Sequence, residues 1–403
     1  MIKKSGKLEY VGYDIRGPVL DLANDMLDQG IEILKLNTGN PAPFGFDAPD
    51  EMIQGLIENV RASQGYSESR GIEPARAAIA AYCAEKGIKG ITPNDIYTGN
   101  GISELILLSM QALLEPGDEV LVPVPDYPLW TAAITLAGGT AVTYMCDEHA
   151  EWNPDTADIA AKITSRTRAV VVINPNNPTG ALYPKEILLE IAELARKHKL
   201  IVYSDEIYDQ LVMDGHVHHS MAALAPDLFT VTFNGLSKSH LIAGFRSGWM
   251  CLSGDKAGAK DYIQGLNMLA SMRLCSNVLA QSVIPYALAD RETPAALVRP
   301  GGRIYEQRAY ITKAINDIPG LSVVEPKAAF YLFPKMDVKR WNITNDEQFA
   351  VDFLKEKQVL ITQGSGFHWP RPDHFRIVYL PDMDTLEQLA ARLADFLDGY
   401  WQK

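Results

Sequence analysis

Residues 169–180 read Ala-Val-Val-Val-Ile-Asn-Pro-Asn-Asn-Pro-Thr-Gly, and this stretch decides the fold. Its apolar, largely β-branched half, Ala169 to Ile173, predicts a buried strand, and the asparagines and prolines that follow predict a polar loop. Apolar residues then recur at helical spacing from Lys185 to Lys199, and a second apolar run covers Leu200 to Tyr203. A strand, a helix and a second strand in this order predict a parallel sheet covered by helices.

The same alternation of apolar runs and helical patterns extends from about Asp95 to Leu252. After about Arg299 the pattern changes to strands and helices in α+β order. The further strands predicted in the first region are Ile96 to Thr98, Phe229 to Phe233 and Gly248 to Leu252. Those predicted in the second region are Leu321 to Pro326, Phe330 to Phe333 and Phe375 to Tyr379.

These two patterns predict an α/β protein with two domains, which a length of 403 residues allows. We expect a large domain over residues 49–296 and a smaller C-terminal domain over residues 297–403. Residues 1–48 are punctuated by proline and glycine, as at Gly17-Pro18, so we expect an N-terminal arm that also forms part of the small domain.

The bulk composition narrows the classes of function. A formal net charge of −13 argues against a nucleic-acid or anionic-membrane partner, because both select a basic surface. The cysteines show no C-x-x-C spacing, and the basic start of the chain runs into no hydrophobic signal core. We therefore expect reduced thiols and a cytoplasmic protein. The cysteines are Cys83, Cys146, Cys251 and Cys275.

Several polar or ionisable side chains that could bind a ligand or take part in catalysis follow the predicted strands. Asn177 lies in the loop after Ala169 to Ile173, Asp205 and Tyr208 follow the next strand, and Lys238 follows Phe229 to Phe233. Ligands of open α/β sheets bind beyond the carboxyl ends of the strands, which is where these residues fall. We therefore expect one shared site.

These residue types match the needs of pyridoxal phosphate chemistry. Lys238 would hold the cofactor aldehyde as a Schiff base and, once released, shuttle a proton at the substrate Cα. Asp205 would keep the pyridine nitrogen protonated, so that the ring withdraws electrons from the carbanion. Asn177 and Tyr208 would donate hydrogen bonds to the ring oxygen.

A phosphate dianion needs several donors, and two elements offer them. Arg246 carries a guanidinium fork suited to phosphate. Gly101, Ile102 and Ser103 lie where a strand turns into the helix that continues from Glu104, so their backbone N–H groups would meet an anion at a helix N-terminus.

The set Asn177, Asp205, Tyr208, Lys238 and Arg246, in this order and roughly this spacing, resembles the class I aminotransferases of pyridoxal phosphate fold type I. The resemblance implies a mostly parallel seven-stranded sheet in the large domain, a smaller α+β domain, and a homodimer with shared active sites. Further matching segments run along nearly the whole chain: Asn37 to Pro41, Tyr66 to Gly71, Arg76, Pro116 to Asp118, and Phe375 to Ile377.

The resemblance also implies roles for individual residues. Tyr127 would stack on the cofactor ring, and Tyr66 would reach the phosphate bound by the partner subunit. Arg376 would clamp the substrate α-carboxylate, with Asn177 and the Gly39 backbone beside it.

One position departs from the family pattern. Three residues before the lysine many members carry a phosphate-binding serine, whereas this chain has Gly235. Ser237, directly before Lys238, is a substitute source of that hydroxyl. The departure affects the expected phosphate ligands and leaves the role of the lysine intact.

Within the family, three segments are most similar to bacterial glutamate-pyruvate (alanine) aminotransferases: Tyr13 to Pro18, Asn37 to Phe46, and Gly235 to Trp249. This similarity implies transfer of the amino group of L-alanine to 2-oxoglutarate in two ping-pong half-reactions. Such an enzyme must accept both a methyl group and a distal carboxylate in one pocket. We hypothesise that Arg16, with Tyr13, closes on the longer substrate.

Other functions share part of the pattern. A pyridoxal-phosphate-dependent carbon-sulfur lyase, or an aminotransferase for valine or aromatic donors, would need the same cofactor residues. A regulator that senses the cofactor and binds DNA would need a basic winged-helix segment, for which the short arm before Gly39 leaves no room.

Two single motifs suggest other chemistry, and neither is complete. The run Gly215-His216-Val217-His218-His219 suggests a metal, but no cysteine lies at ligand spacing, so we expect no metal site. Gly99-Asn100-Gly101 begins a dinucleotide fingerprint, yet Glu104 stands where the third glycine belongs. An NAD-dependent dehydrogenase is therefore only a runner-up analogy, and it leaves Lys238 without a role.

Overall fold

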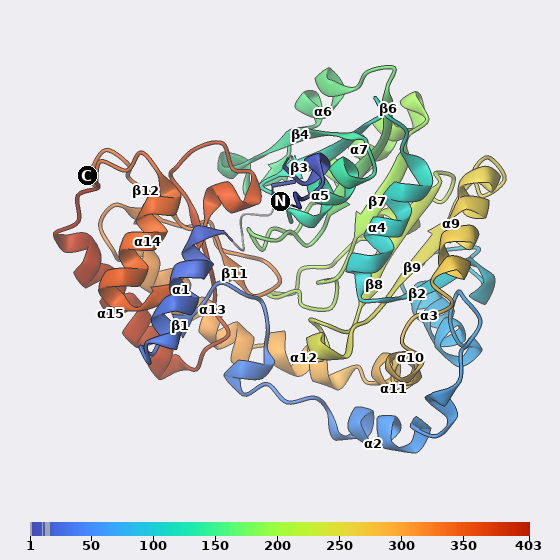
Figure 1. The fold of residues 1–403 in the computed structure, drawn as a ribbon, viewed down its shortest axis with the longest axis horizontal. Helices are drawn as coiled ribbons and strands as arrows, with labels where there is room; N and C mark the ends of the chain where they lie inside the picture. The colour runs from blue at the N-terminus through green and yellow to red at the C-terminus, as the bar shows by residue number, and fades with distance from the viewer. Residues whose placement is uncertain (1, 10, 13–16) are drawn as a thin grey trace.

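The computed structural model describes residues 2–9, 11–12 and 17–403, and a large sheet forms its centre (Figure 1). The strand order is β2-β9-β8-β7-β6-β3-β4-β5. The strands are β2 Ile96–Asn100, β3 Glu119–Val124, β4 Thr140–Asp147, β5 Asn153–Pro154, β6 Thr167–Ile173, β7 Ile201–Asp205, β8 Thr230–Gly235 and β9 Ser247–Ser253.

The sheet is mostly parallel, as predicted. Strands β4, β3, β6, β7 and β8 pair in parallel, whereas β9 is antiparallel to both β8 and β2. The resemblance implies seven strands, and the sequence pattern predicts five of these individually, namely β2, β6, β7, β8 and β9. Strands β3 and β4 were not predicted by residue range, and the two-residue β5 adds a short antiparallel edge beside β4.

Helices cover both faces of this sheet, so successive residues of a strand enter different cores (Figure 1). On β6, Val171 packs in one core with α4 and α9, and its neighbours Val170 and Val172 pack in the other with α7. This two-sided burial explains the unbroken apolar run in the sequence. The covering helices are α4 Ile102–Leu113, α5 Leu129–Leu136, α6 Thr156–Lys162, α7 Lys185–His198 and α9 Lys260–Met272.

A second layer of helices and short strands follows toward the C-terminus. Its three-stranded antiparallel sheet has the order β11-β15-β14. The elements are α13 Arg303–Asn316, β10 Leu321–Ser322, β11 Tyr331–Leu332, β12 Lys335–Met336, α14 Asp346–Lys357, β13 Val359–Leu360, β14 Thr362–Gln363, β15 Phe375–Val378 and α15 Met383–Asp398.

One predicted strand in this layer is wrong in length. Leu321 to Pro326 was expected to be extended and paired, but only Leu321 and Ser322 pair, with β12. The backbone N–H of Val323 instead donates to the side chain of Asn316 at 2.9 Å. The N–H of Val323 is therefore not available to continue the ladder.

The start of the chain packs against this C-terminal layer. Helix α1, Pro18–Asp28, lies beside α14 (Figure 1), and β1, Leu34–Lys35, pairs in parallel with β13. Residues before the central sheet therefore share a core with residues from the end of the chain.

Short helices fill the remaining side of the molecule. Helices α2, α10 and α11 lie together at the edge of the central sheet near β2 and α9 (Figure 1). The short helices are α2 Asp50–Asn59, α3 Glu73–Glu85, α8 Met221–Leu224, α10 Val278–Ser282, α11 Ile284–Ala289 and α12 Glu292–Val298. Among the described residues, no helix combines the length and the apolar character needed to cross a bilayer.

Candidate active site

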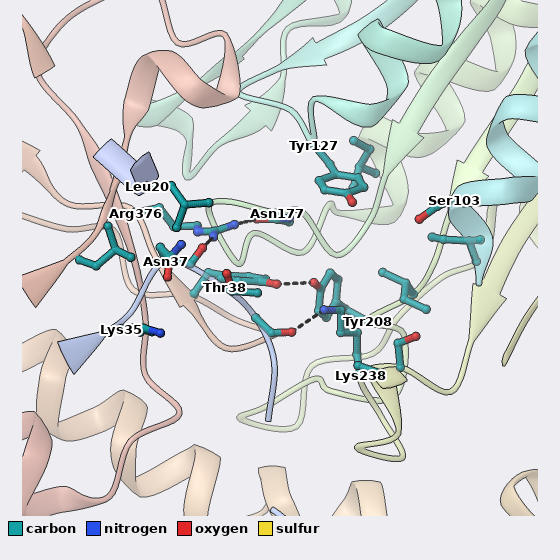
Figure 2. A pocket seen from close by; sticks show the side chains of 18 of the residues that line it. Leu20, Lys35, Asn37, Thr38, Ser103, Tyr127, Asn177, Tyr208, Lys238 and Arg376 are labelled. Carbon is teal, nitrogen blue, oxygen red and sulfur yellow. Dashed lines mark hydrogen bonds between the residues drawn. The ribbon is translucent and has the colours of Figure 1, made fainter. Parts of the chain in front are cut away.

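A cavity of about 590 Å³ lies between the carboxyl ends of the central strands and the C-terminal layer (Figure 2). Most of the residues expected in a shared site line it. They are Gly39, Ile102, Tyr127, Asn177, Asp205, Tyr208, Ser237, Lys238, Arg246 and Arg376.

Lys238 follows β8 and extends its amine into the cavity (Figure 2). Its Nζ donates to the carbonyl oxygen of Gly39 at 2.6 Å and lies 5.7 Å from the centre of the Phe330 ring. A Cβ atom on Gly39 would come within 2.1 Å of the Tyr331 hydroxyl. Only glycine therefore allows this part of the chain to approach so closely.

Asp205 ends β7 and is buried. Its carboxylate accepts hydrogen bonds from Trp130 Nε1 at 3.2 Å and from the Ile207 N–H at 3.3 Å. Burial raises the pKa of Asp205 to about 6, although both hydrogen bonds act to lower it. A cation bound beside this carboxylate would relieve the cost of its buried charge.

Tyr208 and Tyr331 meet across the cavity wall (Figure 2). Their hydroxyl oxygens are 2.6 Å apart, and the rings pack edge to face with centroids 5.6 Å apart. Burial, together with the nearby Tyr331, raises the pKa of Tyr208 well above its ordinary value. Tyr208 therefore keeps its proton at neutral pH and is able to donate a hydrogen bond to a ligand.

Arg376 lies on β15 and is held from several sides. Its Nη1 donates to Asn177 Oδ1 at 3.0 Å, and its Nη2 donates to the carbonyl oxygen of Asn37. The guanidinium also lies 4.7 Å from the ring centre of Tyr331 and 4.6 Å from that of Phe367. Because Asn177 uses its amide oxygen here, its NH₂ group is the part that is able to donate to a ligand.

The opposite end of the cavity suits an anion. The guanidinium of Arg246 donates to the carbonyl oxygens of Ala243 and Asn100 at 2.9 and 3.3 Å. The N–H of Gly101 donates to the Arg246 carbonyl at 2.7 Å, so it is already used within the protein. The first residues of α4, beginning at Ile102, have N–H groups without partners inside the helix.

Gly101 therefore has a steric role in this arrangement. A Cβ atom there would lie 2.2 Å from Arg246 Nη2, and the residue has a φ of 72°. Glycine allows both the left-handed backbone and the close approach of the guanidinium.

The donor set of the cavity fits pyridoxal phosphate. An arginine and a helix N-terminus suit the phosphate, a buried carboxylate suits the ring nitrogen, and an amine suits the aldehyde. Tyr127 lines the cavity wall facing Lys238 (Figure 2), where a ring would lie between them.

Four expected site residues are not among those that line the cavity, and one of them is Gly101, which lies beside Arg246. Tyr66 is 82% exposed and does not line the cavity. Tyr13 and Arg16 lie outside the residues that the structure describes.

Several residues of the site were missed in the sequence, among them Trp130, which hydrogen-bonds Asp205, and Tyr331. Trp130 lies three residues after Tyr127, and this helical spacing was the only local signal for it. Tyr331 lies in a predicted strand, and nothing near it in the sequence points to Tyr208. Its role depends on a contact between residues 123 positions apart.

Comparison with known proteins agrees with this geometry. The family model for aminotransferase class I and II matches residues 31–393. The chain is 57% identical to the glutamate-pyruvate aminotransferase AlaA of Escherichia coli K12, over all of this chain and 99% of that one. It is 50% identical to the alanine aminotransferase of Mycobacterium tuberculosis, over 99% of this chain and 93% of that one.

Solved structures show the same likeness. An aminotransferase from Escherichia coli superposes with a TM-score of 0.99 at 56% identity, covering 100% of both chains. The alanine aminotransferase of Pyrococcus furiosus superposes with a TM-score of 0.93 at 37% identity, covering 98% of this chain and 100% of that one.

Proposed function

Because the chain belongs to the class I and II aminotransferases, we propose that it transfers the amino group of L-alanine to 2-oxoglutarate, giving pyruvate and L-glutamate. The observation that supports this proposal most directly is that Lys238, Asp205 and Arg376 line one cavity. The full-length relatives include glutamate-pyruvate and alanine aminotransferases. The reaction is reversible and proceeds in two half-reactions that share one cofactor.

The family implies pyridoxal 5′-phosphate, which supplies, when bound, an electron sink for the carbanion at the substrate Cα. Lys238 would hold the aldehyde and move the proton at the substrate Cα. Asp205 would keep the ring nitrogen protonated, and Tyr208 and Asn177 would donate to the ring oxygen. The protonated state of Tyr208 and the unused NH₂ group of Asn177 support these roles.

The phosphate would lie at the N-terminus of α4. The N–H groups of Ile102 and Ser103, the hydroxyl of Ser237 and the guanidinium of Arg246 would bind it. Gly101 contributes by leaving room for the guanidinium, since its own N–H is used within the protein. Tyr127 would stack on the ring.

Arg376 would bind the substrate α-carboxylate with both Nη atoms. Asn177, which accepts a hydrogen bond from Arg376 Nη1, and the backbone of Gly39, which also lines the cavity, would assist. For the longer substrate, we retain the hypothesis that Arg16 and Tyr13 close on the distal carboxylate. Unchanged activity of Arg16→Ala with 2-oxoglutarate would contradict that role.

A homodimer would complete the site. A group of apolar residues that are at least one third exposed lies on α2 and the loop after it, on α9 and the loop after it, and on α11 (Figure 1). Such a group marks a protein interface. The residues are Ile53, Ile57, Val60, Tyr66, Met268, Met272, Leu274 and Tyr286. In a dimer that buries this face, Tyr66 would be available to the partner's phosphate.

A single half-reaction tests the function. The purified holoenzyme is mixed with L-alanine alone, and we expect pyruvate in an amount equal to the enzyme together with the absorption change of the aminated cofactor. Glutamate should give the same absorption change. Release of ammonia from cystathionine, with return of the starting spectrum, would instead identify a carbon-sulfur lyase.

A further inference from the structure

A buried group of charged side chains lies behind the candidate active site. Within the segment 205–209, Asp205 and Tyr208 line the cavity, whereas Glu206 and Asp209 do not. Both of these carboxylates are nevertheless buried, and the proposed reaction does not use them. A buried carboxylate needs a partner, so the question is what holds these two.

Lys86 is that partner. It follows helix α3, and its Nζ lies 3.2 Å from Glu206 Oε2 and also pairs with Asp209 Oδ2. The Lys86 side chain is 17% exposed, and each carboxylate side chain is 1% exposed. The hydroxyl of Tyr82 donates to the same oxygen of Asp209.

His218 extends this group to a second functional loop. Its Nδ1 lies 3.2 Å from Lys86 Nζ, and its Nε2 lies 3.1 Å from the carbonyl oxygen of Asn174. An ammonium only donates, so Nδ1 must accept and Nε2 must carry the proton that is donated to Asn174. Asn174 begins the loop that carries Asn177, and its N–H donates to the Asp205 carbonyl at 3.0 Å.

The buried group contains more negative than positive side chains. Burial and the nearby Lys86 lower the pKa of His218 to about 4, so the imidazole is neutral. Burial alone would lower the pKa of Lys86, but Asp209 and Glu206 outweigh it and raise the pKa, so the lysine stays cationic. One ammonium thus faces two carboxylates.

The arrangement resembles a metal site in which a side chain supplies the cation. Glu206, Asp209 and His218 each offer a ligand atom, and these atoms lie within 4.8 Å of one another. The ammonium of Lys86 contacts all three side chains.

We propose that Lys86 is a positioning residue for the transamination proposed above. Its ammonium takes the place of a metal ion and holds the loop that carries Asn177 against the segment that carries Asp205 and Tyr208. The proposal rests on that function. Without the ammonium, two buried carboxylates on the segment 205–209 would have no counter-charge. Burial and two hydrogen bonds have the largest effects on the pKa of Asp205, and the charge of Glu206 has a smaller one that raises it. Loss of the ammonium beside Glu206 would therefore alter Asp205 at the cofactor site.

Four variants distinguish a role of Lys86 in positioning the active-site residues from a general loss of protein stability. Lys86→Met keeps the unbranched side chain up to the position of Cε and removes the ammonium, and Lys86→Arg keeps the charge. His218→Gln removes the imidazole bridge to Asn174 and leaves the ion pairs. Lys335→Met is the matched control, because Lys335 forms a partly buried pair with Glu148 at 2.5 Å beside His374 and does not line the cavity.

Two readouts are taken on the purified full-length protein: the dissociation constant of pyridoxal phosphate, and the pH at which the absorption of the bound cofactor changes. We expect Lys86→Met to weaken cofactor binding about tenfold or more and to shift that pH. Lys86→Arg should stay within about threefold of the wild type, since the cation remains. Lys335→Met should lower the melting temperature without moving either readout.

If Lys86→Met does not fold, His218→Gln carries the test with the same expected direction. Wild-type values of both readouts in folded Lys86→Met, or in folded His218→Gln where Lys86→Met does not fold, would overturn the proposal. Equal damage from Lys86→Arg and Lys86→Met would also overturn it, because the charge would then not be the cause. A wild-type protein that binds the cofactor but forms no pyruvate from alanine would contradict the proposed function, while the cofactor readouts would still decide on Lys86.

Discussion

Asp205 shows how a residue that is suited to binding a cation can lower the stability of the cofactor-free protein. Its pKa is raised from 3.8 to about 6 by burial, so folding favours the protonated form. The unfolded chain therefore holds fewer protons between these two pH values, and the stability contributed by this residue falls as the pH rises through them. Above about pH 6 the charged carboxylate costs about 3 kcal/mol, which a bound cation would offset.

We therefore predict that Asp205→Asn stabilises the cofactor-free protein and abolishes transamination. The gain in the free energy of unfolding should reach up to about 3 kcal/mol near neutral pH and disappear below about pH 4. Urea unfolding of both apoproteins across this range measures it. A variant that is less stable than the wild type at neutral pH would contradict this account of the site.

Tyr331 contacts Tyr208 through a hydrogen bond that depends on its hydroxyl oxygen. Its hydroxyl lies 2.6 Å from that of Tyr208, so we predict that Tyr331→Phe lowers the rate of the alanine half-reaction about tenfold, through loss of one buried hydrogen bond. Tyr379→Phe is the control, because its buried hydroxyl donates to the Ala329 carbonyl at 3.1 Å and Tyr379 does not line the cavity. Equal rate losses in the two variants would show that Tyr331 acts through general packing.

At the scale of elements, the site depends on loops that follow β6, β7 and β8. Lys238 and Asp205 could be predicted from the sequence, because each follows an apolar run and the carboxyl ends of parallel strands share one edge. Trp130 and Tyr331 could not, because their partners come from distant segments. The boundaries of the two domains, at residues 48/49 and 296/297, remain a prediction.

The loop that carries His218 should give the protein a pH-dependent stability. The pKa of His218 is lowered to about 4 from an ordinary 6.5, mainly by burial, so the unfolded chain binds a proton that the folded protein does not. Stability is therefore lost as the pH falls through this interval. Between about pH 7.5 and pH 5 the loss should be about 2 kcal/mol.

His218→Gln should remove this part of the pH dependence, although it lowers stability at every pH by removing hydrogen bonds. Urea titrations of the cofactor-free wild type and variant at the two pH values measure the difference. If both proteins lose the same free energy on acidification, His218 is not neutral in the folded state.

At the scale of the whole molecule, the role proposed for Tyr66 depends on a second chain. The residue is 82% exposed and does not line the cavity that Lys238 and Arg376 line in the same chain. It lies with the exposed apolar side chains of α2, α9 and α11, which an isolated chain would leave in water. In a symmetric dimer each subunit would give Tyr66 to the other's site.

Mixed dimers test this arrangement directly. Lys238→Ala and Tyr66→Ala homodimers should each be nearly inactive, but a mixed dimer contains one site with Lys238 from one subunit and Tyr66 from the other. Unfolding and refolding the two variants together in equal amounts should therefore restore about a quarter of the wild-type activity. Lys238→Ala mixed with Arg376→Ala should restore none, because both residues line the same subunit's cavity. Equal recovery in both mixtures, or in neither, would mean that Tyr66 is not shared between subunits.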